Sequence, residues 1–327
     1  MELGVTEAVQ KHVHRHVIER HPVTQRRLAF EHSRPRLLRE MAAEATGVFI
    51  YVYPGIASTA SFTLNHMEAQ FSSIFQIGWA YALGIAFAII TSAATSGGHF
   101  SPGITLSLAI FRGFPWKKVP FYIAAQIFGA FLAGVLLMGQ YHEQISLYAA
   151  TTTKAGLGTV FNGGPASILV TLPMPTQTNQ GSLVLIEFFV DTFLGLVIWS
   201  VLDPGNPFIH PAGAPFVVGL AYAAMIWGFA PATISTNMAR DLGCRLAAAV
   251  FYGWDVFSYM NYSWISIIIN IPATLVAVSY YEVVMRDSLD RIAKGVTRHE
   301  SGDEGLYRHL SKTGKLDRLA TELSLGV

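Results

Sequence analysis

The chain has 327 residues and a formal net charge of +1, and 52% of its residues are hydrophobic whereas only 13% are charged. In soluble domains roughly a quarter of the residues are charged, so this composition excludes an ordinary water-soluble enzyme and a disordered protein. The near-neutral charge gives no basic field for nucleic acid, and the single cysteine, Cys244, excludes an intrachain disulfide and a cysteine-based metal site.

The apolar residues are gathered in long blocks separated by polar segments. A helix that spans a bilayer needs about 20 predominantly apolar residues, and six blocks meet this requirement: 41–60, 75–95, 119–139, 182–202, 213–232 and 263–284. Two shorter apolar stretches, Ser101–Phe111 and Asn237–Tyr252, cannot cross and predict re-entrant half-helices. We therefore expect an all-α membrane protein with six transmembrane helices and two half-helices.

The distribution of lysine and arginine predicts how the chain crosses the membrane. Eight of the 22 such residues lie in the first 39 positions and eight lie beyond residue 285, whereas the segment 141–181 carries only Lys154. By the positive-inside rule both ends are cytoplasmic and the segment 141–181 lies outside. The expected organisation is a cytoplasmic tail over 1–39, a membrane domain over 40–285 and a second cytoplasmic tail over 286–327.

The two halves of the membrane domain resemble each other. Each has a glutamate in its first apolar block, Glu44 or Glu187, followed by a second block, a half-helix and a third block. Because three spans reverse the direction of the chain, the second half, about 182–285, is expected to be inverted relative to the first, about 40–140. Inverted repeats whose broken helices meet at mid-membrane are a transport architecture.

The segments around the half-helices carry the most specific signal. The first reads Ser-Gly-Gly-His-Phe-Ser-Pro-Gly over 96–103, and the second reads Thr-Ile-Ser-Thr-Asn-Met-Ala-Arg over 233–240. Ser101 and Asn237 are residue types that cap helix N-termini, and Pro102 suits the first helical position, where a backbone N–H has no partner. Each segment is therefore predicted to enter the membrane as irregular backbone and to begin a helix near its middle.

These segments resemble the signature loops of the major intrinsic protein family, the aquaporins and aquaglyceroporins, and the resemblance extends over about 40–285. Their central triads depart from the family's Asn-Pro-Ala, because here they read Ser101-Pro102-Gly103 and Asn237-Met238-Ala239. The stretch Thr171-Leu172-Pro173 resembles an outer-loop motif of the aquaglyceroporins. The resemblance implies a right-handed helical bundle around a narrow pore, assembled as a homotetramer in the plasma membrane.

The resemblance also implies the residues of a selectivity filter. By spacing against the family, the outer constriction is formed by Tyr81, Ile226, Ile234 and Arg240. An arginine inside a membrane protein is expected to face a cavity, since exposure to lipid is costly. Its guanidinium can bind a solute oxygen while its charge repels cations. A wall of one aromatic and two aliphatic side chains suits glycerol, urea or hydrogen peroxide and offers water few partners.

The irregular backbone before each half-helix is predicted to form a ladder of carbonyl acceptors for the solute. Its members are Gly97, Gly98, His99, Phe100, Thr233, Ser235 and Thr236. Asn237 can cap its helix with the side-chain oxygen and still offer an amide N–H to the solute, whereas Ser101 has one hydroxyl proton and a shorter reach. The half-helix dipoles point their positive ends at the pore centre and disfavour cations and protons.

Two interpretations of the acidic residues within the spans remain open. Glu44, Glu187 and Asp191, which lies one helical turn after Glu187, could carry protons in a proton- or ion-coupled secondary transporter, because intramembrane carboxylates mark proton relays. In the family that the chain resembles, the matching glutamates instead brace the pore loops by accepting backbone N–H groups, and the symmetric positions of Glu44 and Glu187 favour this role.

The expected function is a passive channel for small uncharged polar solutes, glycerol-like polyols first and water second, that excludes ions and protons. Such a channel needs no cofactor and no metal, and its expected partners are the solutes, the lipid bilayer and further copies of the chain, with no nucleic acid. An enzyme is disfavoured because the sequence has no G-x-S-x-G, G-x-x-x-x-G-K-[ST] or H-E-x-x-H motif.

Overall fold

The computed structural model describes residues 24–65, 72–203, 206, 208–230 and 233–286. These residues are helical or irregular, and the described part of the chain contains no strand. One compact unit is formed within 35–204 and 209–287, and the short helix α2 (Gln25–Ser33) falls outside it. The predicted tails lie mostly outside the described residues, namely over 1–23 and 287–327.

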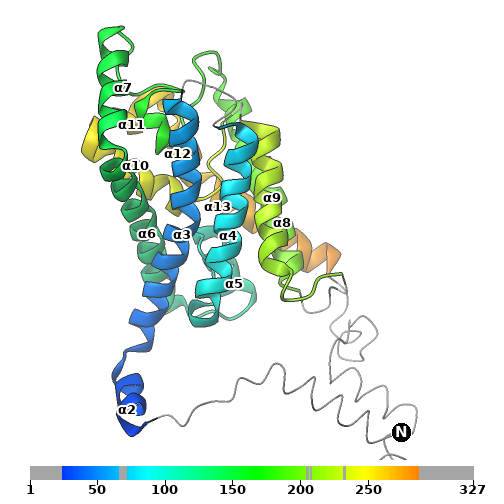
Figure 1. Cartoon of the computed structure of the whole chain (residues 1–327). Helices are drawn as coiled ribbons and strands as arrows, with labels where there is room; N and C mark the ends of the chain where they lie inside the picture. Colours follow the sequence, from blue (N-terminus) through cyan, green and yellow to red (C-terminus); the bar gives the residue numbers. More distant parts are fainter. Residues whose placement is uncertain (1–23, 66–71, 204–205, 207, 231–232, 287–327) are drawn as a thin grey trace, which may run out of the picture. The chain divides into compact units, whose positions relative to one another are not determined.

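Long apolar helices make up the compact unit (Figure 1). They are α3 (Arg36–Leu64), α4 (Ile74–Ser96), α6 (Val119–Gln140) and α8 (Gln180–Val201), and none has fewer than 22 residues. A helix of this length measures about 33 Å, enough to cross a hydrocarbon core of about 30 Å. The chain from Ser263 to Met285 supplies a fifth helix that is long and apolar enough to cross.

The fifth predicted span is shorter than its apolar block. The block 213–232 contains α9 (Ala214–Phe229), a helix of 16 residues that packs against α4 and α8. Pro215 lies in its first turn, where a missing backbone N–H costs nothing. Residues 231 and 232 lie outside the described part. With α9 in the bundle, the six apolar blocks correspond to six membrane helices.

The last apolar block forms a broken helix rather than a continuous one. Its pieces are α12 (Ser263–Ile268) and α13 (Asn270–Tyr280), followed by the π-helical turn η5 (Tyr281–Met285). Pro272 has no backbone N–H to donate to the carbonyl of Ile268, so one α-helical hydrogen bond is missing there, while those from Ile269 to Ile265 and from Ala273 to Ile269 remain.

The two short apolar stretches form the half-helices α5 (Pro102–Phe111) and α10 (Met238–Tyr252). Each packs against the third long helix of the opposite half, because α5 contacts α13 and α10 contacts α6, and the two half-helices also contact each other. Glycine allows this close approach: a Cβ on Gly243 of α10 would lie 2.4 Å from the carbonyl oxygen of Ile127 of α6. The contacts of the two halves therefore match as an inverted repeat requires.

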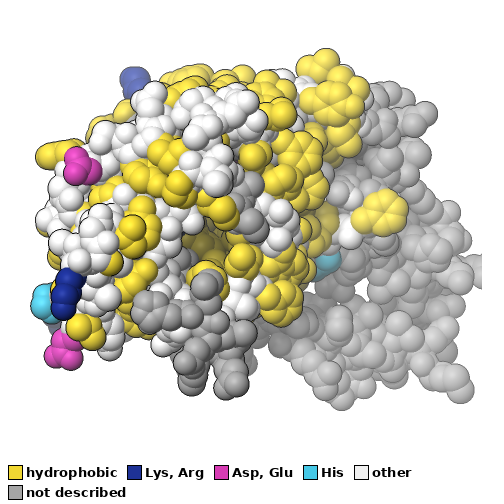
Figure 2. Space-filling view, turned by 90° about the horizontal axis from the view of Figure 1, so that it is seen from above, with side chains coloured by type: hydrophobic (Ala, Val, Ile, Leu, Met, Phe, Trp, Pro, Cys, Tyr) yellow, Lys and Arg dark blue, Asp and Glu magenta, His cyan; other side chains and the backbone are white. Residues whose placement is uncertain are grey.

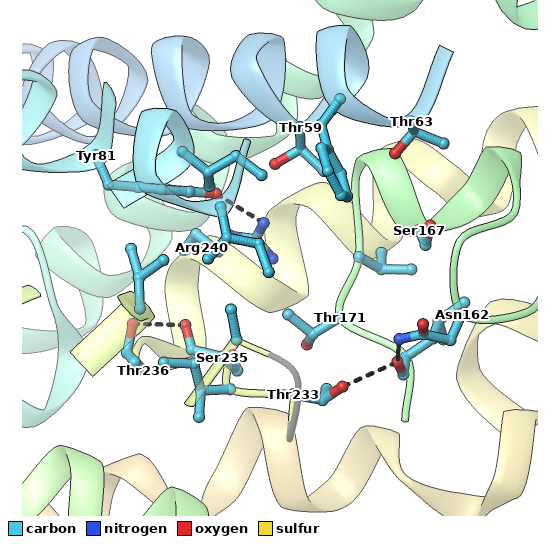
Figure 3. A pocket seen from close by; sticks show the side chains of 18 of the residues that line it. Thr59, Thr63, Tyr81, Asn162, Ser167, Thr171, Thr233, Ser235, Thr236 and Arg240 are labelled. Atoms are coloured by element: carbon cyan, nitrogen blue, oxygen red, sulfur yellow. Dashed lines mark hydrogen bonds between the residues drawn. The ribbon is translucent and has the colours of Figure 1, made fainter. Parts of the chain in front are cut away.

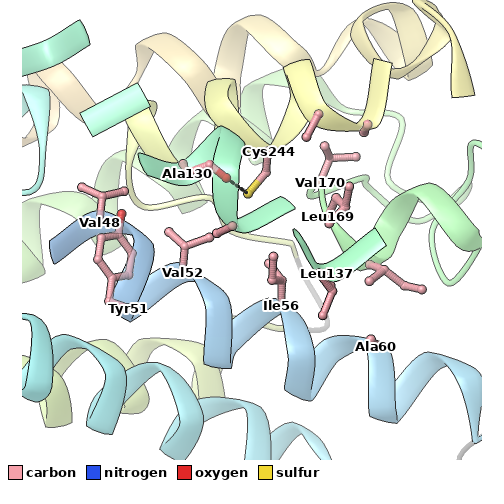
Figure 4. Packing of buried hydrophobic residues seen from close by; sticks show 14 of the residues in the cluster. Val48, Tyr51, Val52, Ile56, Ala60, Ala130, Leu137, Leu169, Val170 and Cys244 are labelled. Atoms are coloured by element: carbon pink, nitrogen blue, oxygen red, sulfur yellow. Dashed lines mark hydrogen bonds between the residues drawn. The ribbon is translucent and has the colours of Figure 1, made fainter. Parts of the chain in front are cut away.

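The segment 141–181 is more ordered than its Thr-, Gly-, Ser- and Pro-rich composition indicates. It contains α7 (His142–Lys154) and the short 3-10 helix η2 (Pro165–Ile168). Ile168 and Leu169 are fully buried in the main hydrophobic cluster together with side chains of α3, α6 and α10 (Figure 4). This burial fixes the segment over the bundle at the side where the functional site opens.

Candidate functional site

The backbone before each half-helix is irregular and takes unusual conformations. Residues 97–100 and 233–237 have no regular secondary structure. Phe100 and Thr236 directly precede the N-cap residues of the two half-helices, Ser101 and Asn237. Their φ angles are 50° and 65°. Non-glycine residues rarely adopt this left-handed region, so the surrounding structure must hold them there.

Glu44 of α3 holds the first loop. Its carboxylate accepts the backbone N–H of His99 at 3.0 Å and of Phe100 at 2.8 Å. The side chains of Ser96 and Gln126 also donate to it, at 2.6 Å and 2.7 Å. The carboxylate is fully buried, and four donors of this kind satisfy a buried charge.

Glu187 of α8 holds the second loop in the equivalent way. Its carboxylate accepts the backbone N–H of Ser235 at 2.9 Å and of Thr236 at 2.6 Å. Like Glu44, it is fully buried and lies beside a residue with a left-handed backbone. Both glutamates therefore brace the loops through backbone N–H groups in this structure.

Asn237 joins the two loops as well as capping α10. Its Oδ1 accepts the N–H of Ala239 at 2.9 Å and of Arg240 at 3.3 Å, as a capping side chain should. Its Nδ2 donates to the carbonyl oxygen of Phe100 at 2.8 Å. We predicted that this amide would be offered to the solute, but one of its N–H groups is instead committed to the first loop. The carbonyl of Phe100 is correspondingly engaged by protein.

Ser101 occupies the N-cap position of α5, but its hydroxyl makes no capping hydrogen bond. The predicted helix start is therefore correct, but the serine side chain does not cap it. Its backbone carbonyl instead accepts two hydrogen bonds from Thr105, one from the backbone N–H at 2.9 Å and one from the hydroxyl at 2.8 Å. Gln126, which also contacts Glu44, donates to the same Thr105 hydroxyl at 3.0 Å. The first loop thus relies on its glutamate and on neighbouring side chains instead of on a serine cap.

The residues that depart from the family's Asn-Pro-Ala triads fit the packing around the two helix starts. A Cβ on Gly103 would lie 2.9 Å from Oγ1 and 3.0 Å from Cβ of Thr274 on α13, so the alanine usual at this position would crowd that helix. Pro102, beside it, is buried at the first position of α5. Met238 is half-buried at the first position of α10, and Ala239 after it is fully buried.

A cavity of about 420 Å³ lies beside the second loop, lined by α3, α4, α9, the segment 141–181 and the loop itself. It opens on the face seen in Figure 2, which is hollowed between hydrophobic side chains. The structure brings all four predicted filter residues to its wall: Tyr81, Ile226, Ile234 and Arg240. Thr233, Ser235 and Thr236 also line it (Figure 3), whereas the first-loop candidates Gly97, Gly98, His99 and Phe100 do not.

Arg240 lines the cavity with a guanidinium that is held on two sides. Its Nη2 donates to the hydroxyl of Tyr81 at 2.9 Å, and its guanidinium lies 5.9 Å from the centre of the same ring. Nη1 is buried 3.8 Å from the Asp241 carboxylate and has no hydrogen-bond partner among the described residues. The side chain therefore supplies a fixed positive charge to the wall of the cavity.

Arg245 and Asp241 fix the outer wall of the cavity to α10. Arg245 donates to both oxygens of Asp241, at 2.7 Å and 3.0 Å, and also to the carbonyl of Thr171 and the hydroxyl of Ser266. The hydroxyl of Thr171 donates to Asp241 at 2.9 Å. Because Arg245 and Asp241 are fully buried, this network ties the segment 141–181 to the helix that carries Arg240.

The sequence interpretation missed several residues that line the cavity. Tyr51, which the sequence analysis did not single out, lines the cavity, and its buried hydroxyl has no partner among the described residues. It lies seven residues after Glu44 on α3, about two helical turns along the same face, which is a signal that could have identified it. The polar residues Thr59, Thr63, Asn162 and Ser167 also line the cavity (Figure 3), and no motif marks them.

The model of the family described as "Major intrinsic protein" matches residues 31–280. The chain belongs to the major intrinsic protein family. It is 45% identical over 261 residues to Aquaporin-3 of Laccaria bicolor, a match that covers 78% of each chain. It is 33% identical over 250 residues to Aquaglyceroporin-2 of Rhizophagus irregularis, covering 76% of this chain and 77% of that one.

The fold is also that of the family. The X-ray structure of the aquaglyceroporin from Plasmodium falciparum matches with a TM-score of 0.66 at 26% identity, covering 76% of this chain and 97% of that one. This major intrinsic protein is therefore a multi-pass membrane protein and a passive channel for water and small uncharged solutes. It is not an enzyme, and neither the structure nor the relatives support a coupled transporter.

Proposed function

We propose that this major intrinsic protein conducts glycerol-like polyols in preference to water, through the cavity beside Arg240. The composition of the cavity wall is the observation that carries the proposal. Four isoleucines, Ile74, Ile77, Ile226 and Ile234, contribute to the wall, and Arg240 contributes a charged, polar group there. A solute with carbon on one side and hydroxyls on the other matches both surfaces, whereas water gains nothing from an apolar wall.

The proposed filter assigns a role to each of its members. Arg240 supplies a donor for the solute oxygen and a positive charge that repels cations. The Tyr81 hydroxyl, 2.9 Å from Nη2, orients the guanidinium. Ile226 and Ile234 face the carbon atoms of the solute. Beyond them, the carbonyls of the two loops accept hydrogen bonds from its hydroxyls.

We further propose a homotetramer in the plasma membrane, with both tails in the cytoplasm and the segment 141–181 outside. The distribution of lysine and arginine supports the orientation. Large exposed apolar side chains on α4 and α9 support burial against lipid or further copies: Phe75, Phe87, Ile90, Phe216 and Leu220. Relatives of this chain from Rhizophagus irregularis and Botryotinia fuckeliana are named aquaglyceroporins, which supports a polyol as solute.

Stopped-flow light scattering on proteoliposomes tests the proposed solute. After an inward glycerol gradient is applied, we expect fast reswelling with a weak temperature dependence, and no effect of a proton ionophore. Empty liposomes provide the background, and a sucrose gradient measures water flux in the same vesicles. Conduction of water without glycerol would contradict the polyol preference, and flux that needs a pH gradient would contradict a passive channel.

A further inference from the structure

We propose that Asp191 is a protonated positioning residue that donates a hydrogen bond to Glu187 and so holds the second pore loop in place. This inference rests on the proposed function, because the loop forms part of the cavity wall. It gives a role to Asp191, a buried acidic residue of α8 whose negative charge a channel for neutral solutes does not require.

The geometry places two carboxyl groups together in a dry site. Asp191 follows Glu187 by one turn of α8, so the two side chains lie on the same face of the helix. Glu187 is fully buried and Asp191 is 2% exposed. Two neighbouring carboxyl groups that are both buried away from water are not both ionised, so the pair shares one proton.

The donors around the pair decide which residue carries the proton. Both oxygens of Glu187 accept the N–H of Ser235, at 3.1 Å and 2.9 Å, and one of them also accepts the N–H of Thr236 at 2.6 Å. Such bonds favour the ionised form. The Oδ2 atom of Asp191 is buried and has no donor among the described residues. The proton therefore resides on Asp191, and Glu187 accepts it as a hydrogen bond.

The neighbouring groups do not supply an alternative charge for Asp191. Tyr222 of α9 packs against the cluster that contains Val190 and Leu194 of α8, and a phenol is ordinarily uncharged at neutral pH. The ion pairs found among the described residues do not include Asp191.

The first loop shows why such a donor is needed. Glu44 receives two side-chain donors, Ser96 and Gln126, in addition to its two backbone N–H groups. In the second half, Asp191 fills the role of the side-chain donor. Loss of this donor would free Glu187 to move, and Ser235 and Thr236 would move with it in the wall of the cavity.

Two substitutions separate the donor from the carboxyl group. Asp191→Asn keeps the shape and offers an N–H without a titratable proton, whereas Asp191→Leu keeps comparable bulk and offers nothing. We expect the glycerol flux of Asp191→Asn to stay near that of the unmodified protein. We expect Asp191→Leu to lower it roughly tenfold, the scale of a lost hydrogen bond to a charged group. Phe189→Leu, on the exposed side of the same helix, is the control and should change little.

Infrared spectroscopy provides a readout that a purely structural role would not move, and it decides the question if Asp191→Leu fails to fold. At neutral pH the unmodified protein should show the carbonyl band of a protonated carboxylic acid, and Asp191→Asn should lack it. An unchanged band in Asp191→Asn, or flux as low as in Asp191→Leu, would overturn the proposal.

A failure of the polyol preference looks different. The unmodified protein would then conduct water without glycerol, and the contrast between Asp191→Asn and Asp191→Leu would appear in the water flux. Flux that needs a pH gradient and disappears in Asp191→Asn would make Asp191 a proton carrier and would overturn the positioning role.

Discussion

Arg240 and Tyr81 illustrate how single residues divide the work of selection. The Tyr81 hydroxyl fixes one side of the guanidinium at 2.9 Å, and Nη1 on the other side is buried 3.8 Å from the Asp241 carboxylate. A charge held in this way repels cations without needing to move, while a neutral solute is not repelled. The positive charge therefore comes from one side chain, and the apolar neighbours set the shape.

Replacing Arg240 tests the charge directly. In Arg240→Ala we expect proton leak to rise, because the fixed positive charge is lost, while flux of neutral solutes persists through the enlarged cavity. A pH-sensitive dye inside proteoliposomes measures the leak, and light scattering measures glycerol flux in the same preparation. A variant that inserts normally and leaks no more protons than the unmodified protein would contradict this role.

Replacing Tyr81 tests the size of the opening. The ring packs against Gly55, where a Cβ would lie 2.2 Å from Cζ of Tyr81, so a larger ring must extend into the cavity. We expect Tyr81→Trp to slow the larger polyols more than glycerol in light-scattering measurements. Tyr81→Phe removes the hydroxyl without adding bulk and is the matched control. Polyol rates that are equal in Tyr81→Trp and Tyr81→Phe would remove Tyr81 from the constriction.

At the scale of elements, the two half-helices occupy equivalent places in the two halves, but their N-termini are stabilised by different hydrogen bonds. α10 begins with a capping asparagine that also bonds to the first loop, whereas α5 begins with a serine whose hydroxyl does not cap. In both halves the main restraint is a buried glutamate from another helix. The triads can therefore vary in sequence as long as the bracing glutamates and the packing behind them are kept.

Gly103 provides a test of that packing. Gly103→Ala restores the residue usual in the family, yet we expect it to destabilise this protein by about 1–3 kcal/mol, the usual cost of overpacking, because the new Cβ meets Thr274 at 2.9 Å. Gly139→Ala is the control: its Cβ would meet nothing within 4 Å on α6, and it should be neutral or stabilising.

Thermal unfolding in detergent measures both Gly103→Ala and Gly139→Ala. Adding Thr274→Ala to Gly103→Ala should recover part of the loss, because the hydroxyl and methyl groups that crowd the new Cβ are removed. Equal midpoints for Gly103→Ala and Gly139→Ala would show that α13 does not constrain the first triad.

At the scale of the whole molecule, hydropathy was sufficient to predict the long membrane helices. It failed for segments that are ordered without being apolar. The blocks 75–95 and 182–202 correspond closely to α4 and α8, because most of their residues are of types that favour lipid or the protein interior. The helix α7 was missed because its residues are largely polar, and its order depends on tertiary contacts such as the bond from Tyr148 to Gly163.

The site could be predicted only as far as motifs and spacing extend. Spacing identified Ile226 and Ile234 as filter candidates, and both reach the cavity wall. The bond from Asn237 to Phe100 joins residues 137 positions apart, and the bonds from Ser235 and Thr236 to Glu187 join residues 48 and 49 positions apart. Such pairings are fixed by the fold, and no local pattern encodes them.

Blocking the cavity chemically tests most directly whether it is the route of permeation. Cys244, the single cysteine of the chain, is buried, so Ile226→Cys places one accessible thiol in the cavity. Leu185→Cys, at a position 68% exposed on α8, is the control outside it. A membrane-impermeant methanethiosulfonate added from the side of the segment 141–181 should abolish most of the glycerol flux of Ile226→Cys and leave the unmodified protein and Leu185→Cys unchanged. Undiminished glycerol flux through fully labelled Ile226→Cys would contradict the account.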